Sequence, residues 1–454
     1  MNRSNYFTGK KITLMGLGLL GRGVGDAKFL AESGAELIVT DLKSSEDLAP
    51  SLKKLSPKNY HLKAVTYVLG RHRLEDFRHR DLIIKAAGVS LDSPFIAEAR
   101  RNKIPIMMST ALFAKLSGTK IIGVTGTRGK TTVTHLIYEI LKHHCQCQGF
   151  PLTLWLGGNI KGISTLALLP KVRPKDWVVL ELDSWQLQGF GALKISPQIS
   201  VFTNFLPDHL NYYRGSMKKY FADKANIFKY QKKDDAVFAG REVARKIKSP
   251  GRKIVPPALP SNWRLNLAGE HNRVNASLAV GVARELGVPD RVIKKVLADF
   301  ASVPGRLELI HTINGVKFYN DTTATSPDAM MAALQSLGPP GKIILIAGGT
   351  DKNFPNDSLI KFASSSLKLK QVILLPGTGT DKLMKSVSST DGLKTNEATN
   401  WQAVNTLAEA VNFASRLAKR GDSVLLSPGF ASFGLFKNEF DRGDKFNRLV
   451  KKIK

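Results

Sequence analysis

The stretch GVTGTRGKTTVTHLIYEIL, residues 123–141, decides the fold of the middle of this 454-residue chain. The residues just before it, 120–124, form a short run rich in β-branched side chains, which is typical of a buried strand. After it, apolar residues recur at helical spacing from Val133 to Leu141. Gly126 and Gly129 therefore lie where a strand ends and a helix begins.

This turn has the residue types of a phosphate-binding loop. Its glycines permit positive φ, and a helix N-terminus presents backbone N–H groups and partial positive charge to an anion. A lysine at 130 reaches a terminal phosphate, and a threonine at 131 ligates Mg²⁺. The spacing is a compact variant, because Val124 stands where the longer G-x-x-x-x-G-K-[ST] motif has glycine. A glycine turn with a surface lysine is the simpler alternative. We expect ATP and Mg²⁺ at Gly126, Thr127, Arg128, Gly129, Lys130, Thr131 and Thr132.

A second glycine pattern, GLGLLG at 16–21, follows an apolar run that begins at Lys11. A helical pattern to about Ser33 and a strand at 36–40 come next, which together predict a strand–helix–strand nucleotide-binding unit. Asp41 lies about 20 residues beyond the last motif glycine, where an acidic side chain contacts a ribose hydroxyl. Taken alone, this pattern predicts a nicotinamide-dependent dehydrogenase.

Strand and helix patterns alternate along the whole chain, which favours an α/β fold with parallel sheets. We expect three domains. They are a Rossmann-like N-terminal domain at 1–108, a central P-loop ATPase domain with a parallel sheet at 109–303, and a C-terminal Rossmann-like α/β domain at 304–454.

Composition indicates an ordinary soluble globular protein, with 43% apolar and 23% charged residues. Apolar runs such as 343–347 are far too short to cross a bilayer, and the N-terminus lacks the apolar segment of a secretory signal. We therefore expect no membrane span and a cytoplasmic location. Cys145 and Cys147 cannot form a disulfide framework, and the group 143–147 is more simply a helix end than a metal site.

The net charge of +30 is the one unusual feature of the composition. It leaves open a basic P-loop ATPase that binds nucleic acid. Lysine and arginine are spread over the chain without a long basic tract or an interleaved aromatic ladder, so we expect no obligate nucleic-acid partner.

Polar residues follow two strand patterns beyond the phosphate loop. Glu181 ends one such pattern, and His209 follows another. Because ligands bind at the carboxyl edge of a parallel sheet, both side chains are candidates for a metal site with Thr131. Taken one at a time, a cap or a satisfied core group is the simpler alternative for each. Lys224 lies on a helical pattern and would by default be a solvated lysine.

Nine motifs in one order resemble the ATP-dependent Mur ligases of peptidoglycan synthesis, over nearly the whole chain. They are GLGLLG from 16, GTRGKTT from 126, LGGNI from 156, LELDSWQL from 180, PDHL from 207, GEHNRVN from 269, PGRLE from 304, YNDTTAT from 319 and LSPGFASF from 426.

The resemblance implies a role for each matching position. Gly18, Leu19, Leu20, Asp41 and Gly88 would hold the nucleotide sugar, and Asn159 its muramoyl or uracil portion. Lys130, Glu181, His209 and Lys224 would be catalytic; Thr131, Glu181 and His209 would place metal ions with Lys224, if that lysine is carbamylated. Asn272, Asn275, Arg306 and Asp321 would contact ATP, and Thr325, Lys352, Ser432 and Phe436 would hold the incoming amino acid.

The implied activity adds D-glutamate to UDP-N-acetylmuramoyl-L-alanine through an acyl phosphate. We expect a monomer. The chain departs from the family pattern at Thr323, where many members have lysine, at Asn211, where many have aspartate, and at Arg128. Because Thr323 removes a positive charge near the amino-acid site, a sister ligase that adds another amino acid, including L-glutamate, stays an alternative.

Overall fold

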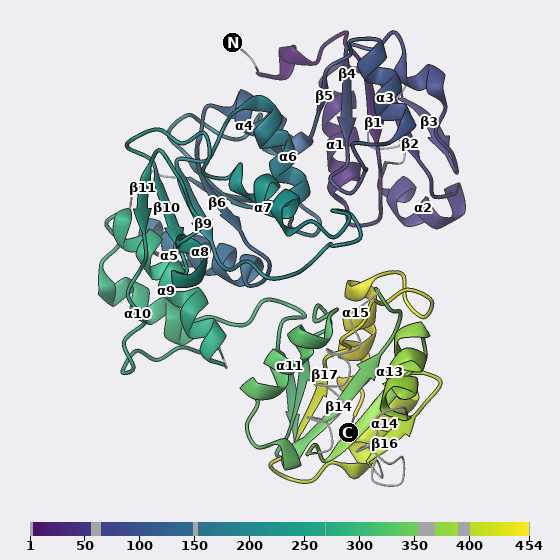
Figure 1. The fold of residues 1–454 in the computed structure, drawn as a ribbon, viewed down its shortest axis with the longest axis vertical. Coiled ribbons are helices and arrows are strands. Elements are labelled where there is room, and N and C mark those ends of the chain that lie inside the picture. The colour runs from purple at the N-terminus through teal and green to yellow at the C-terminus, as the bar shows by residue number, and fades with distance from the viewer. Residues whose placement is uncertain are drawn as a thin grey trace. The chain divides into compact units, whose positions relative to one another are not determined.

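The computed structural model describes residues 3–55, 65–148, 153–267, 269–352, 368–388 and 400–453. The chain forms two compact units. One contains Met1–Pro260 and Asn275–Val296, and the other contains Ser261–Val274 and Leu297–Lys454. Three separate sheets carry the fold, two in the first unit and one in the second (Figure 1).

The first sheet is parallel and has the strand order β3-β2-β1-β4-β5. The order reverses beside β1, and such a switch point is where open α/β sheets bind ligands. The strands are β1 (Lys11–Met15), β2 (Glu36–Asp41), β3 (Val65–Leu69), β4 (Leu82–Lys85) and β5 (Ile106–Met107). The helices are α1 (Arg22–Glu32), α2 (Ser45–Leu52), α3 (Pro94–Arg101) and α4 (Ser109–Ser117).

The second sheet is also parallel, in the order β11-β10-β9-β6-β8-β7. Val124 of β6 pairs with Glu181 of β8, and Thr125 pairs with Phe202 of β9, so the phosphate loop emerges between the ends of two strands. The strands are β6 (Lys120–Thr125), β7 (Leu154–Gly158), β8 (Trp177–Glu181), β9 (Ile199–Phe202), β10 (Ala236–Ala239) and β11 (Arg252–Ile254). The helices are α5 (Lys130–Gln148), α6 (Ser184–Leu193), α7 (Met217–Ala225) and α8 (Arg241–Ala244), followed by α9 (Glu270–Glu285) and α10 (Asp290–Asp299).

The third sheet is mixed, in the order β12-β13-β17-β14-β15-β16, because β12 and β13 form an antiparallel hairpin. Its strands are β12 (Glu308–Ile313), β13 (Val316–Asn320), β14 (Ile343–Gly348), β15 (Gln371–Leu375), β16 (Trp401–Ala403) and β17 (Ser423–Leu426). Its helices are α11 (Pro327–Ser336), α13 (Thr378–Ser388), α14 (Leu407–Leu417) and α15 (Glu439–Val450). Short 3₁₀ turns occur at Arg3–Tyr6, Lys53–Leu55, Leu74–Phe77, Leu166–Leu168 and Pro340–Lys342.

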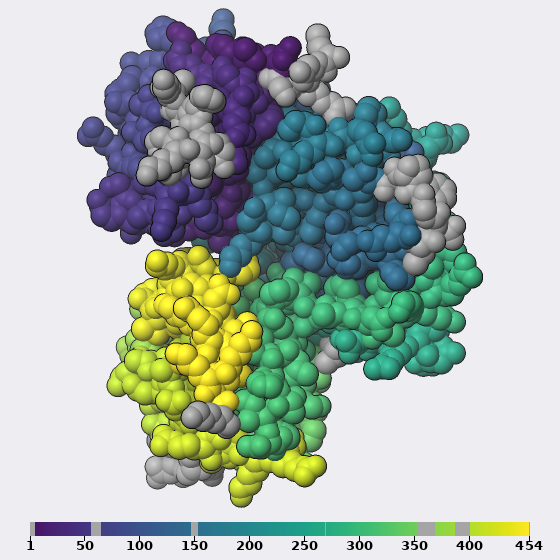
Figure 2. Space-filling model, turned by 180° about the vertical axis from the view of Figure 1, so that it is seen from behind, coloured from purple at the N-terminus to yellow at the C-terminus, as the bar shows by residue number. Residues whose placement is uncertain are grey.

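The predicted α/β class is confirmed, with three domains built on these three sheets. The first two domains lie side by side within the first unit, purple and blue in Figure 2, and hydrogen bonds join them directly. The exact domain borders stay a prediction. Within the described ranges, no helix combines the length and apolar character that a membrane span needs.

Candidate functional site

The turn between β6 and α5 has a backbone that only glycine fits. Gly126 has φ 143° and Gly129 has φ 79°. A Cβ on Gly126 would collide with the hydroxyl of Thr203, and one on Gly129 would collide with the amide of Asn275. Lys130 begins α5, and Thr131 and Thr132 lie in its first helical turn. The helix therefore starts directly after the glycine loop, as the sequence predicts.

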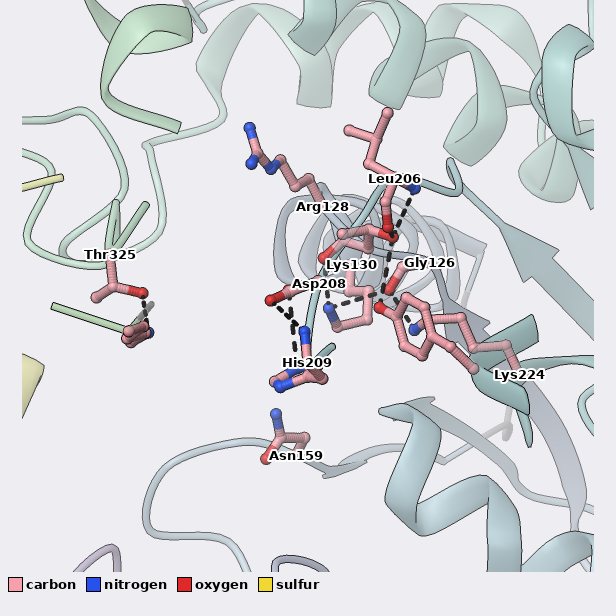
Figure 3. A network of polar contacts seen from close by, with 12 residues as sticks. Gly126, Arg128, Lys130, Asn159, Leu206, Asp208, His209, Lys224 and Thr325 are labelled. Atoms are coloured by element: carbon pink, nitrogen blue, oxygen red, sulfur yellow. Dashed lines mark hydrogen bonds and ion pairs between the residues drawn. The ribbon is translucent and has the colours of Figure 1, made fainter. Parts of the chain in front are cut away.

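The segment that follows β9 holds this turn in place (Figure 3). The hydroxyl of Thr127 donates to the carbonyl of Leu206 at 3.1 Å and accepts from its N–H at 2.9 Å. The N–H of Arg128 donates to Oδ1 of Asn204 at 2.9 Å, and Thr203 donates to the carbonyl of Arg128. The loop is thereby fixed by its neighbour in the sheet and not by its own residues alone.

Two lysines converge on one carbonyl of the loop. Nζ of Lys130 lies 3.2 Å from the carbonyl oxygen of Gly126, and Nζ of Lys224 lies 2.7 Å from the same oxygen. Lys224 is buried, with 1% of its surface exposed. Burial, followed by the positive charge of Lys130, lowers the pKa of Lys224 well below its usual value. The neutral form of this amine is thereby favoured.

Glu181 supplies a buried carboxylate at the end of β8. Its Oε1 accepts a hydrogen bond from Nδ2 of Asn159 at 3.3 Å. Its Oε2 is buried, and within the described residues it has no hydrogen-bond partner. Burying a carboxylate oxygen without a donor is costly, so this atom fits a cation as its missing partner.

His209 has left-handed backbone, with φ 52°. Its ring centroid lies 4.6 Å from that of Trp185, and Nε2 is 3.7 Å from Oδ2 of Asp208 (Figure 3). Burial lowers the pKa of His209; the carboxylate of Asp208 opposes this, and the charges of Lys130 and Lys224 add to it. A neutral imidazole suits either a metal ligand or a proton acceptor.

Across the part of the chain that the structure describes, no three His, Cys, Asp or Glu side chains cluster as a metal site. The predicted metal set of Thr131, Glu181, His209 and Lys224 contains only two such residues. It would need further oxygens, from nucleotide phosphates or from a modified lysine.

A pocket of about 510 Å³ lies at the switch point of the first sheet. Gly18, Leu19, Leu20, Asp41 and Gly88, which were predicted to contact the substrate, all line it. Asn159 is not among its lining residues, but the adjacent Gly158 is.

Asp41 supports the glycine loop that forms this pocket. Its Oδ2 accepts from the N–H groups of Leu17 at 2.9 Å and Gly18 at 3.0 Å, and its Oδ1 accepts from the backbone N–H of Lys43 at 2.9 Å. The carboxylate therefore organises the loop, in addition to any ribose contact.

Sequence reasoning missed Lys85, a buried lysine that lines the same pocket. Its Nζ donates to the carbonyls of Ala86, Ala87 and Val89, at 3.3, 3.4 and 2.8 Å. Burial lowers the pKa of Lys85 to about 8. No spacing rule distinguishes this lysine from a solvated one, because its partners are carbonyl groups.

The nucleotide-contacting residues predicted outside the loop divide between the two units. Asn275 lies in the first unit, against Gly129, whereas Asn272, Arg306 and Asp321 belong to the second. Asp321 accepts from the N–H of Leu307 at 3.1 Å and from the hydroxyl of Ser427 at 2.9 Å. Burial raises the pKa of Asp321 to about 7.

The structure brings two of the four residues predicted to hold the amino acid into contact and places a third on an adjoining segment. Nζ of Lys352 donates to the hydroxyl of Thr325 at 2.9 Å. Thr350 pairs with Ala431 through two backbone hydrogen bonds of 2.9 and 3.0 Å, which places Ser432 on the adjoining segment. Phe436 is different, because its ring packs on the core beside α14 and α15 and lines a separate cavity of about 470 Å³.

Sequence reasoning also missed Arg442, a fully buried arginine on α15. Its guanidinium donates to Thr322 through Oγ1 at 3.1 Å and the carbonyl at 2.9 Å, and to the carbonyl of Phe430 at 3.3 Å. Thr323, the position where relatives have lysine, donates its hydroxyl to the carbonyl of Gly305 at 3.0 Å. Arg442 therefore holds the segment that contains Thr323, the position where relatives have a charged lysine.

Comparisons with known proteins give one consistent result. The family model described as "Mur ligase MurD-like, N-terminal domain" matches residues 10–108, "Mur ligase middle domain" matches 124–250, and "Mur ligase, glutamate ligase domain" matches 305–430. A UDP-N-acetylmuramoylalanine–D-glutamate ligase of Roseiflexus sp. (strain RS-1) is 36% identical, covering 97% of this chain and 98% of that protein. The enzyme of the same name from Borreliella burgdorferi (strain ZS7) is 33% identical, with 97% of each chain covered.

Solved structures show the same fold at lower identity. The structure of the UDP-N-acetylmuramate-alanine ligase MurC from Thermotoga maritima has a TM-score of 0.62 at 18% identity, covering 98% of this chain and all of that one. Because three family models match in order and full-length relatives exceed 30% identity, this chain belongs to the Mur ligase family.

Proposed function

We propose that this chain is the ATP-dependent ligase that joins D-glutamate to UDP-N-acetylmuramoyl-L-alanine in peptidoglycan synthesis. The observation that carries the proposal is full-length similarity to relatives with that name, in a chain whose phosphate loop lies beside Glu181 and Lys224. The protein acts as a monomer in the cytoplasm, where its nucleotide substrates are found.

The reaction couples two bond changes. A carboxylate is a poor electrophile, so the alanyl carboxylate first takes the γ-phosphoryl group of ATP, which releases ADP. The amine of glutamate then attacks this acyl phosphate, loses a proton, and expels inorganic phosphate as the amide forms. The loop N–H groups and Lys130 stabilise the charge on the transferred phosphoryl oxygens. The candidate proton acceptor is a metal-ordered water, or His209 if its one acceptor nitrogen does not hold the metal ion.

Mg²⁺ supplies charge neutralisation at the phosphates when it is bound. Thr131, Glu181 and His209 would hold it, and the unpartnered Oε2 of Glu181 fits that role. Lys224 contributes after carbamylation, in which its neutral amine adds to CO₂, an N–C bond forms and a proton leaves. The lowered pKa of Lys224 favours this step, because only the neutral amine is nucleophilic.

Glutamate is held in the third domain by Thr325, Lys352 and Ser432, with the ammonium of Lys352 opposite a substrate carboxylate. Phe436, which lines a separate cavity, is left out of this set. The specific observation that favours a different amino acid is Thr323, whose hydroxyl is already bonded to Gly305 and carries no charge. L-Glutamate and other amino acids are therefore the second candidates. The comparisons give no support to a nucleic-acid-binding ATPase.

The test is ADP and phosphate release by the purified protein with UDP-N-acetylmuramoyl-L-alanine and MgATP. One amino acid is added at a time, as the D or the L enantiomer. We expect release with D-glutamate and mass-spectrometric detection of the amide product. Release that is equal without either substrate contradicts the proposal. Preference for another amino acid replaces it with the sister activity.

A further inference from the structure

The start of α1 is docked onto the loop that follows β7. The N–H of Gly162 donates to the carbonyl of Leu20 at 2.8 Å. A Cβ on Gly21 would lie 3.2 Å from Cα of Gly162, so the two backbones approach closely. One turn along α1, the hydroxyl of Ser164 donates to the buried carboxylate of Asp26. This contact joins the helix behind the first pocket to the second sheet.

Arg22 extends this contact toward the phosphate loop. It is the first residue of α1 and lines the 510 Å³ pocket, and its Nη1 donates to Oδ1 of Asn159. Asn159 in turn bonds Glu181 twice, through Nδ2 to Oε1 at 3.3 Å and through its N–H to the carbonyl at 2.7 Å. A continuous hydrogen-bonded path therefore runs from the pocket to the carboxylate.

The hydrogen-bond donors and acceptors along this path fix the orientation of the Asn159 amide. A guanidinium only donates, so Arg22 requires the oxygen of the Asn159 amide and turns Nδ2 toward Glu181. With Oε1 held by that donor, Oε2 stays as the oxygen without a partner among the described residues. Glu181 pairs in register with Val124, two residues before the phosphate loop. The orientation of the Glu181 carboxylate therefore affects the binding of a ligand at the phosphate loop.

We propose that Arg22 is a positioning residue that couples the binding of an anionic nucleotide sugar in the first pocket to the binding of a magnesium nucleotide at the phosphate loop. The identity of the two ligands rests on the proposed function. An anion at the N-terminus of α1 fixes the guanidinium, which fixes the amide of Asn159 and then the carboxylate of Glu181. Because the first ligand orders this path, the second ligand binds to a site that is already ordered, which is positive cooperativity.

The experiment measures this coupling directly by isothermal titration calorimetry on the full chain. The Kd of UDP-N-acetylmuramoyl-L-alanine is determined with and without saturating MgADP, which allows no turnover. In the unmodified protein we expect binding to be at least about fivefold tighter with MgADP, within the usual range of allosteric coupling. In Arg22→Met we expect the ratio of the two Kd values to fall within about twofold of one, and in Arg22→Lys to lie between.

Two control variants separate the path from general effects. Lys28→Met removes another cation from α1, one that lies 3.9 Å from Glu32, and should keep the original ratio. Ser164→Ala removes a docking bond of α1 without touching Arg22 or Asn159 and should also keep it. Circular dichroism confirms that each variant is folded, and the reciprocal titration of MgADP must give the same factor.

The possible results are decisive for this inference. A ratio near one in the unmodified protein, or an unchanged ratio in Arg22→Met, overturns it. Loss of coupling in Ser164→Ala assigns the effect to docking of α1 in general and also overturns the role of Arg22. These are binding measurements, so they are independent of the amide-forming assay: coupling without amide formation refutes the proposed function alone, and amide formation without coupling refutes only this inference.

Discussion

The phosphate loop and the segment 321–325 differ in how they use basic side chains. In the phosphate loop, Lys130 and Lys224 both bond to the carbonyl of Gly126, beside a carboxylate whose Oε2 has no described partner. In the second segment, Arg442 is surrounded by acceptors, with two on Thr322 and one on Phe430. At the phosphate loop, the charge of the Glu181 carboxylate is left for a ligand to neutralise. In the second region, the charge of Arg442 is used to hold backbone carbonyl groups. We therefore expect chemistry at the first region and positioning at the second.

The largest effect is expected from Lys130→Ala. Removing the cation that faces the transferred phosphoryl group should lower kcat by at least about 10³-fold, because such electrostatic contacts act mainly in the transition state. Phosphate release under saturating substrates measures this. Lys142→Ala, on the far end of α5 beside Glu139, is the matched control and should be neutral. Activity of Lys130→Ala near that of the unmodified protein would remove the loop from the mechanism.

Lys224→Ala is expected to lower kcat by about 10²-fold, and short carboxylates such as formate should restore part of the loss. The reason is that the free carboxylate replaces the carbamate in the vacated space. Activity is assayed against added formate, with intact-protein mass spectrometry to detect one bound CO₂ on the unmodified chain. A variant that no carboxylate rescues would indicate that Lys224 is a structural cation held by Gly126.

Asp321→Asn should change how stability depends on pH. Burial raises the pKa of Asp321 from 3.8 to about 7, so between these pH values the folded state holds a proton that the unfolded state has lost. The contribution of this group to the free energy of unfolding therefore falls as pH rises through the window, by up to about 4 kcal/mol. Urea unfolding from pH 4 to 8 should show a flatter profile for Asp321→Asn. The exposed Asp328→Asn serves as the control, and identical profiles for Asp321→Asn and the unmodified chain would refute the assignment.

The smallest effect is expected from Thr323→Lys, which restores the charge that relatives carry. A partly exposed cation adds about 1 kcal/mol or less, so KM for the amino acid should fall by less than about fivefold, with KM for ATP unchanged. Steady-state kinetics in both substrates distinguish these effects. A rise in the KM for glutamate would show that Lys352 already provides the charge that this site can use.

Local motifs allowed much of this structure to be predicted, since the strand–turn–helix at Lys120–Gln148 and the glycine loop at 16–21 are contiguous in sequence. Short edge strands such as β11 and β16 could not be predicted, because three residues are too few to show a periodic pattern. The roles of Arg442, Lys85 and Arg22 could not be predicted either. Their partners are backbone carbonyls or lie far along the chain, 137 residues away for Arg22 and Asn159, so composition and spacing cannot reveal them.

The first pocket is bounded by residues from two domains, with Leu19 and Gly88 on one side and Gly158 and Gln186 on the other. A small molecule that fills it would act as a bridge between those domains. Unfolding of either domain would release the ligand, so each unfolding step would cost its binding free energy. In a thermal melt, such an inhibitor should move the transitions of the N-terminal and central domains upward together. A compound that occupies only the glycine-loop half would raise the first transition and leave the second where it was.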